Sequence, residues 1–209
     1  MSQLTEKRIK RMHELVEYDR KVGAFGVSLA GMDEVGRGPL MGNVVAACVI
    51  MPEEPLILVD DSKKLSAKRR QTAYEQIMEC ALYIGIGEAS PEEIDDINIK
   101  NATKLAMARA AEHVPASLCI VDAEKDLAVP FPILSIIKGD ATSYHVAAAS
   151  IIAKVTRDTQ MLELAEKYPG YGWETNMGYG TKAHVEAICK LGPTPLHRKT
   201  FIRKWLGAE

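Results

Sequence analysis

The sequence lacks the patterns that mark several common classes of protein. No apolar stretch is long enough to span a bilayer, and the charged residues 1–21 lack the apolar core of a signal peptide. The four cysteines are scattered without a C-x-x-C pair, which favours small buried side chains in a reducing compartment over disulfides. These absences predict a cytoplasmic protein without a membrane segment.

Nucleotide and zinc motifs are missing as well. The sequence contains neither G-x-x-x-x-G-K-[ST] nor G-x-G-x-x-G, and its cysteines and histidines do not have the spacing of zinc ligands. It also has no internal repeats. At 209 residues with 47% hydrophobic content, the chain has the size and composition of one globular domain.

The net charge of −2 hides an uneven distribution of charge. Residues 190–209 are strongly basic, whereas residues 88–96 are acidic and contain no basic side chain. Basic ends suit a polyanionic partner, although solvated surface charge is the commoner explanation of any single run.

Hydrophobic periodicity predicts alternating helices and strands. The expected strands are residues 26–32, 43–51, 82–86, 117–121 and 130–137. The expected helices are residues 5–21, 66–80, a short one from 91, 98–112, 142–167 and 182–190. Two or three strands first, followed by alternation, favour an α/β fold with a mixed sheet.

An octapeptide with two adjacent acids, GMDEVGRG, is the most informative segment. Neighbouring side chains of a strand point to opposite faces, so Asp33 and Glu34 can share one ion only where the strand ends. Gly36 and Gly38 allow a turn and a close backbone approach, and Arg37 suits phosphate. The segment predicts a metal ion and a phosphate at one place; the alternative is a surface turn.

Two more aspartates have a similar setting. Asp122 ends a predicted strand, and Asp140 opens the longest predicted helix, where it can also serve as a simple N-cap. Glu124 and Asp126 compete with Asp122 as the nearby acid. Four carboxylates in one cleft repel one another, and Mg²⁺ or Mn²⁺ relieves that repulsion. Two such ions about 3.5–4 Å apart support in-line phosphoryl displacement, one activating water and the other stabilising the leaving oxygen.

A series of further motifs, in chain order, resembles the ribonuclease HII family, the type 2 ribonucleases H, over residues 27–201. The matching segments are residues 30–40, 61–66, 138–140, 147–155, 178–181 and 197–198. The resemblance implies an RNase H-like α/β fold, with a five-stranded mixed sheet flanked by helices and a helical C-terminal part. It divides the chain into an N-terminal helical extension (1–25), a catalytic domain (26–190) and a basic C-terminal segment (191–209) packed on or beside that domain.

The activity that the resemblance implies is endonucleolytic. It implies cleavage of the RNA strand of RNA–DNA hybrids, and cleavage 5′ to single ribonucleotides embedded in duplex DNA. The expected mechanism is two-metal-ion hydrolysis with Mg²⁺ or Mn²⁺, which leaves 3′-hydroxyl and 5′-phosphate ends. The expected setting is ribonucleotide excision repair by a cytoplasmic monomer.

The same resemblance assigns roles to individual residues. The implied metal-binding catalytic set is Asp33, Glu34, Asp122 and Asp140. The backbone of Gly36, Arg37 and Gly38 is implied to read the 2′-hydroxyl, and Tyr179 to pack on the sugar beside the cleaved junction. Candidate phosphate contacts are Lys63, Lys64, Lys154, Arg157, Lys182 and His197, each with a solvated or structural role as the alternative.

The chain departs from the family pattern in three places, one of which is the extra charge of residues 122–132 beside the predicted site. Met177 stands where lysine is common, which removes one candidate phosphate contact, and Asn43 stands where proline is common. Two alternative interpretations of the sequence remain open. Ribonuclease HIII has Gly-Lys-Gly after its acid pair and a sizeable N-terminal domain, and a nucleic-acid-binding module would have a degenerate site.

Overall fold

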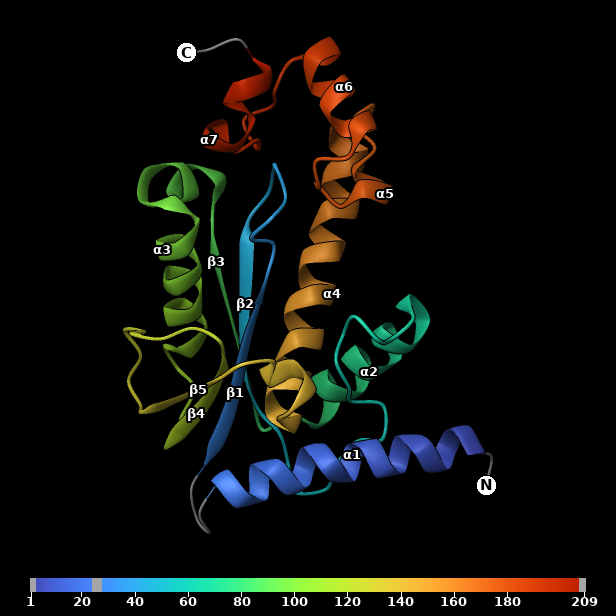
Figure 1. Ribbon diagram of the computed structural model, residues 1–209, viewed down its shortest axis with the longest axis vertical. Helices are drawn as coiled ribbons and strands as arrows, with labels where there is room; N and C mark the ends of the chain where they lie inside the picture. The colour runs from blue at the N-terminus through green and yellow to red at the C-terminus, as the bar shows by residue number, and fades with distance from the viewer. Residues whose placement is uncertain (1–2, 24–27, 207–209) are drawn as a thin grey trace.

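The computed structural model describes residues 3–23 and 28–206, and these form one mixed sheet with helices on both faces (Figure 1). The strand order is β3-β2-β1-β4-β5. The strands are β1 (Leu29–Val35), β2 (Val44–Ile50), β3 (Tyr83–Ala89), β4 (Leu118–Asp122) and β5 (Ile133–Ile136). β1, β2 and β3 pair antiparallel, whereas β1, β4 and β5 pair parallel. The predicted five-stranded mixed sheet is therefore confirmed.

Helices cover the two faces of the sheet. In Figure 1, α3 (Pro91–Ala111) lies on one face and α4 (Tyr144–Lys167) on the other, with α2 (Ala67–Cys80) beside α4 and α1 (Gln3–Val22) across one end. Each face buries its own apolar cluster against these helices. Helix α4 approaches β1 closely at Gly31, where a Cβ atom would lie 2.1 Å from the backbone of His145. None of the described helices has the length and apolar character needed to cross a membrane.

The C-terminal part is helical. It contains α5 (Trp173–Asn176), α6 (Lys182–Leu191), α7 (Lys199–Ile202) and the 3₁₀ turn η2 (Arg203–Trp205). These elements pack around the fully buried Trp173 and form what we call the C-terminal cluster with Met41, Met161, Ile188 and Ile202. A single β-bridge between Met41 and His197 ties this part to the segment that follows β1.

Several predicted boundaries were wrong. The strand expected at residues 26–32 begins at Leu29 and continues to Val35, because the backbone of residues 33–35 still pairs with β2; residues 26–27 lie outside the described ones. β3 likewise extends to Ala89, because it pairs with all of β2. The predicted break before residue 98 is confirmed, since α3 is kinked at Asn98 by a φ of 65°. The short helix α5 was missed.

Candidate active site

Parallel pairing of β1 with β4 brings the first two aspartates together. Met32 lies opposite Val121, so Asp33 adjoins Asp122, the last residue of β4. The expectation that the strand ends at the acid pair was wrong, because β1 continues through both acids to Val35 along β2. The 3₁₀ turn η1 (Gly139–Ala141) adds Asp140, and the backbone N–H of Gly139 donates to Asp122 Oδ1 at 2.8 Å. One carboxylate oxygen from each of these three aspartates lies within 4.8 Å of the others. We call them the three-acid cluster.

The cluster is electrostatically strained. Asp33 is only 6% exposed. Burial, followed by the nearby charges of Glu34 and Asp122, raises the pKa of Asp33 well above its usual range. Burial also raises the pKa of Asp122. Carboxyl groups in such a setting retain protons unless a cation compensates them.

Two of the open alternatives are resolved by the geometry. Ser143, and not Asp140, is the N-cap of α4, because its side chain accepts from the Val146 N–H. Asp126 is 92% exposed and lies near Lys104, so it does not compete with Asp122.

Glu34 lies beside the three-acid cluster and is held by Arg37. Arg37 Nη1 is 3.4 Å from Glu34 Oε1 and 2.8 Å from Glu124 Oε1. Burial raises the pKa of Glu34, and the Arg37 charge opposes that rise. The Arg37 side chain thus contacts two carboxylates, and Glu124 neighbours the site through it.

The glycine loop of residues 36–38 lies against Tyr179. A Cβ atom on Gly38 would be 3.5 Å from the Tyr179 ring, and the Leu40 N–H donates to the Gly178 carbonyl at 2.8 Å. Tyr179 is 45% exposed. Among the described residues, the amide N–H groups of Arg37 and Gly38 have no hydrogen-bond partner. Two segments about 140 positions apart in the sequence therefore meet at one surface.

Two buried arginines support this loop from behind. Arg198 is fully buried and donates to the carbonyl oxygens of residues 36, 37, 39 and 42 at 2.6–3.0 Å. Arg157 donates to the carbonyls of residues 41, 43 and 177. An added Cβ on Gly36, whose φ is +94°, would collide with Arg157. The expectation that Arg157 contacts phosphate was therefore wrong: its donors are occupied by backbone carbonyls.

His197 was also misplaced as a phosphate contact. It is 2% exposed, and its Nε2 lies 3.2 Å from Nε2 of the buried His184. His184 in turn accepts from Trp173 Nε1 and bonds the Tyr179 carbonyl. Burial, and then the neighbouring His184, lowers the pKa of His197 to about 4. Both histidines are neutral parts of the C-terminal core.

The predicted lysine contacts divide into two groups. Lys63 is largely exposed, yet its Nζ lies 3.0 Å from Asp140 Oδ2, which places it at the three-acid cluster. Lys64, Lys154 and Lys182 instead pair with Asp61, Asp158 and Glu186 respectively.

The departures from the family pattern at residues 177 and 43 have different surroundings. Met177 has a left-handed backbone, with a φ of 48°, and its half-buried side chain packs on the C-terminal cluster. Asn43 Nδ2 donates to the carboxylate of Glu88 and so links the start of β2 to the end of β3.

Comparison with known proteins identifies the family. The model of the family described as ribonuclease HII matches residues 30–204. Ribonuclease HII of Bacillus cereus (strain B4264) is 50% identical over 204 residues, covering 95% of this chain and 79% of the relative. Ribonuclease HII of Enterococcus faecalis (strain ATCC 700802 / V583) is also 50% identical over 204 residues, covering 96% of this chain and 74% of the relative.

Solved structures agree. Ribonuclease H2 from Pyrococcus horikoshii OT3 superposes with a TM-score of 0.72 at 27% identity, covering 85% of this chain and 96% of that one. RNase HII from Archaeoglobus fulgidus, solved in complex with PCNA, superposes with a TM-score of 0.69 at 27% identity, covering 82% of this chain and 94% of that one. The family match spans the three-acid cluster, the glycine loop and Tyr179. The chain belongs to the ribonuclease HII family and is a ribonuclease H, a nuclease of the hydrolase class.

Proposed function

We propose that this ribonuclease H cleaves the RNA strand of RNA–DNA hybrids and cuts duplex DNA on the 5′ side of single embedded ribonucleotides. The observation that carries the proposal is the contact of Tyr179 with the glycine loop. That loop, residues 36–38, follows Asp33 by three to five residues. The surface proposed to distinguish ribose from deoxyribose thus adjoins the three-acid cluster, which is proposed to support hydrolysis. We expect the protein to act as a cytoplasmic monomer in ribonucleotide excision repair.

Two divalent ions, Mg²⁺ or Mn²⁺, are proposed to bind Asp33, Glu34, Asp122 and Asp140. The donor set fits, because three hard carboxylate oxygens lie within 4.8 Å of one another. The raised pKa of the buried Asp33 supports the same conclusion, since a cation would remove the repulsion that contributes to it. When bound, such ions lower the pKa of water and stabilise charge on the transferring phosphate.

The chain's own groups supply orientation. Asp122 is oriented by the Gly139 N–H, and Asp33 by the N–H of Glu34, which donates to Asp33 Oδ1 at 2.8 Å. Asp140 Oδ2 receives the Lys63 ammonium. Each of these aspartates is therefore fixed by a hydrogen bond from a neighbouring group. Preorganised carboxylates need no rearrangement when the phosphodiester arrives, which is the condition for efficient electrostatic catalysis.

Recognition of the ribose is proposed to come from backbone and ring together. Only the 2′-hydroxyl separates RNA from DNA at a given site, and it can both donate and accept. The amide groups of Arg37 and Gly38 have no partner among the described residues, and Arg198 holds the carbonyls of the same loop from the opposite side. The half-exposed Tyr179 ring is positioned to pack on the adjacent sugar.

Two lysines are proposed as phosphate contacts. Lys63 offers a largely exposed ammonium at the three-acid cluster. Lys154 donates to Asp158 Oδ1 at 2.7 Å, so it must share or exchange that partner to reach phosphate. Phosphate contacts of this kind set the register of the duplex and do not read its sequence.

The direct test uses three labelled duplexes: all-DNA, DNA with one ribonucleotide, and an RNA–DNA hybrid. With Mg²⁺ or Mn²⁺ the second and third are expected to be cut and the first to remain intact, and EDTA is expected to stop all cleavage. Equal cutting of the all-DNA duplex would contradict the proposed ribose recognition. Cleavage that persists in EDTA would contradict the proposed ions.

A further inference from the structure

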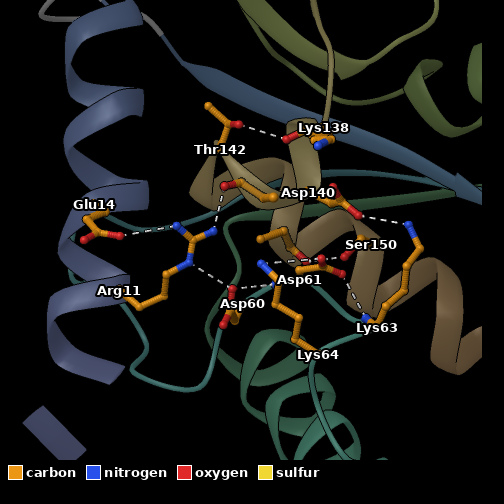
Figure 2. Close-up of polar contacts among 12 residues, drawn as sticks. Arg11, Glu14, Asp60, Asp61, Lys63, Lys64, Lys138, Asp140, Thr142 and Ser150 are labelled. Carbon is orange, nitrogen blue, oxygen red and sulfur yellow. Dashed lines mark hydrogen bonds and ion pairs between the residues drawn. The ribbon is translucent and has the colours of Figure 1, made fainter. Parts of the chain in front are cut away.

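Arg11 connects the N-terminal helix to two separate segments of the catalytic face. Its Nε donates to Asp60 Oδ1 at 3.1 Å, and its Nη2 donates to the carbonyl oxygen of Ala141 at 2.6 Å. Glu14, one turn along the helix, lies 3.4 Å from the same guanidinium. Figure 2 shows Arg11 reaching from α1 between these groups. A planar guanidinium can span two acceptors in this way, whereas an ammonium is a point charge.

The contact with the Ala141 carbonyl acts on the backbone that carries Asp140. Ala141 directly follows Asp140 and ends η1, the turn that places Asp140 in the three-acid cluster. Arg11 therefore holds this turn from the side opposite to the site. The Thr142 hydroxyl closes the same turn by donating to the Lys138 carbonyl at 2.9 Å.

The contact with Asp60 acts on the loop of Lys63, the lysine that contacts Asp140. Asp60 Oδ1, the atom that receives Arg11, also accepts from the Asp61 N–H at 2.9 Å. Asp61 Oδ1 then accepts from the Lys63 N–H at 2.9 Å, which shapes the loop that presents the Lys63 side chain. Figure 2 shows this chain of contacts from Asp60 through Asp61 to Lys63 and Asp140.

The position of α1 does not depend on Arg11 alone. Met12 and Leu15 are buried beneath the helix. Near its other end, Asp19 Oδ2 accepts from the backbone N–H of His145 at 2.9 Å and lies 2.6 Å from His145 Nδ1. Loss of the Arg11 guanidinium is therefore expected to leave the helix in place and to release only the two segments that it bridges.

We propose that Arg11 is a positioning residue for the reaction. It sets the orientation of the Asp140 carboxylate through η1 on one side and through Lys63 on the other. The inference rests on the proposed function, because it assigns Asp140 to ion binding. Groups that orient metal ligands in this way typically contribute about 10–100-fold to metal affinity or activity.

The test compares Arg11→Met with Arg20→Met. Arg20 is exposed on the same helix and has no ion pair within residues 3–23 and 28–206, so the two variants share one change of charge and chemistry. The first readout is the Mn²⁺ concentration that gives a half-maximal rise in melting temperature, which needs no substrate. Arg11→Met is expected to need about tenfold more Mn²⁺, and to lose about 10–100-fold in kcat with KM unchanged. Arg20→Met is expected to match wild type in both.

A wild-type Mn²⁺ midpoint for Arg11→Met would overturn the proposal, and so would a wild-type kcat. If Arg11→Met does not fold, Arg11→Lys decides: one ammonium cannot span both acceptors, so an intermediate loss supports the bridge and wild-type behaviour overturns it. The two claims also fail separately. A wild-type protein that ignores ribonucleotides contradicts the proposed function, whereas an unchanged Mn²⁺ midpoint in the Arg11 variants contradicts only this inference.

Discussion

Replacing Asp33 by Asn is expected to abolish cleavage and, without divalent ions, to stabilise the fold. The exchange keeps the side-chain volume and the Oδ1 acceptor that receives the Glu34 N–H at 2.8 Å. It removes one of three carboxylates whose oxygens lie within 4.8 Å of one another. The replacement of one carboxylate oxygen by an amide group is thus predicted to lower activity and to raise stability.

The magnitude follows from the spacing of the charges. Two unit charges about 4.8 Å apart repel by about 3.5 kcal/mol at an effective dielectric constant of about 20. Proton uptake relieves part of this repulsion, because the pKa of Asp33 is raised by burial and then by its acidic neighbours. We therefore expect Asp33→Asn to raise the free energy of unfolding at pH 7 by about 1–3 kcal/mol, and the melting temperature by about 2–4 °C for each kcal/mol.

The raised pKa of Asp33 also determines how the free energy of unfolding changes with pH. A carboxyl whose pKa is raised in the folded state binds more protons there than in the unfolded chain, so the wild type loses stability as pH rises. The loss begins near the unfolded pKa of 3.8 and is complete above the raised folded pKa. Asn does not titrate, so the advantage of Asp33→Asn should be small near pH 4 and grow toward neutral pH.

Urea unfolding in EDTA, followed by circular dichroism at several pH values, measures this advantage. Asp126→Asn is the matched control, because Asp126 is 92% exposed and the same exchange there should change stability by less than about 0.5 kcal/mol. Added Mn²⁺ should stabilise the wild type more than Asp33→Asn. A variant no more stable than wild type at pH 7 in EDTA, or an advantage independent of pH, would refute the reasoning.

The remaining predictions concern the surfaces around the site. Arg198→Met leaves four loop carbonyls without their donor. We therefore expect chemical denaturation to show a loss of about 2–4 kcal/mol in the free energy of unfolding, and no loss for the exposed control Lys199→Met. Equal stability of the two variants would contradict the support of the loop by Arg198. Tyr179→Ala should slow cleavage at a single ribonucleotide more than cleavage of a long hybrid, and equal losses would make Tyr179 a packing residue. Met177→Lys should steepen the dependence of log K on log salt by about one unit in anisotropy titrations with Ca²⁺, and an unchanged slope would show that residue 177 does not face the duplex.

The acid cluster could be predicted from sequence because its causes are local or topological. Asp33 and Asp122 each follow an apolar run, and parallel strands place their carboxyl ends at one edge. The start of the helix expected from residue 66 was equally accessible: Ser66 is the N-cap of α2, and this cap needs only the N–H of Arg69 three residues later. The apolar run before each aspartate and the Ser66 cap can each be recognised within a few residues of sequence.

The two buried arginines could not be predicted in the same way. In sequence, Arg157 and Arg198 resemble surface cations, because the burial of arginine is decided by its acceptors. Apart from the Met177 carbonyl, those acceptors are carbonyls more than 100 residues away in the sequence, and neither arginine takes part in an ion pair among the described residues. The role of Arg11 is hidden for the same reason, since Ala141 lies 130 positions along the chain. The match at residues 197–198 supported the family resemblance, but it did not predict that both side chains are buried.

The chemistry of the products tests the central claim most directly. Hydrolysis at the three-acid cluster predicts a cut on the 5′ side of a single ribonucleotide, leaving a 3′-hydroxyl on the upstream DNA and a 5′-phosphate on the ribonucleotide. Under the proposed mechanism, the 2′-hydroxyl is bound but does not react. Mass spectrometry of the two fragments from a singly substituted duplex distinguishes this outcome from attack by the 2′-hydroxyl. A 2′,3′-cyclic phosphate, with the cut on the 3′ side, would contradict the account.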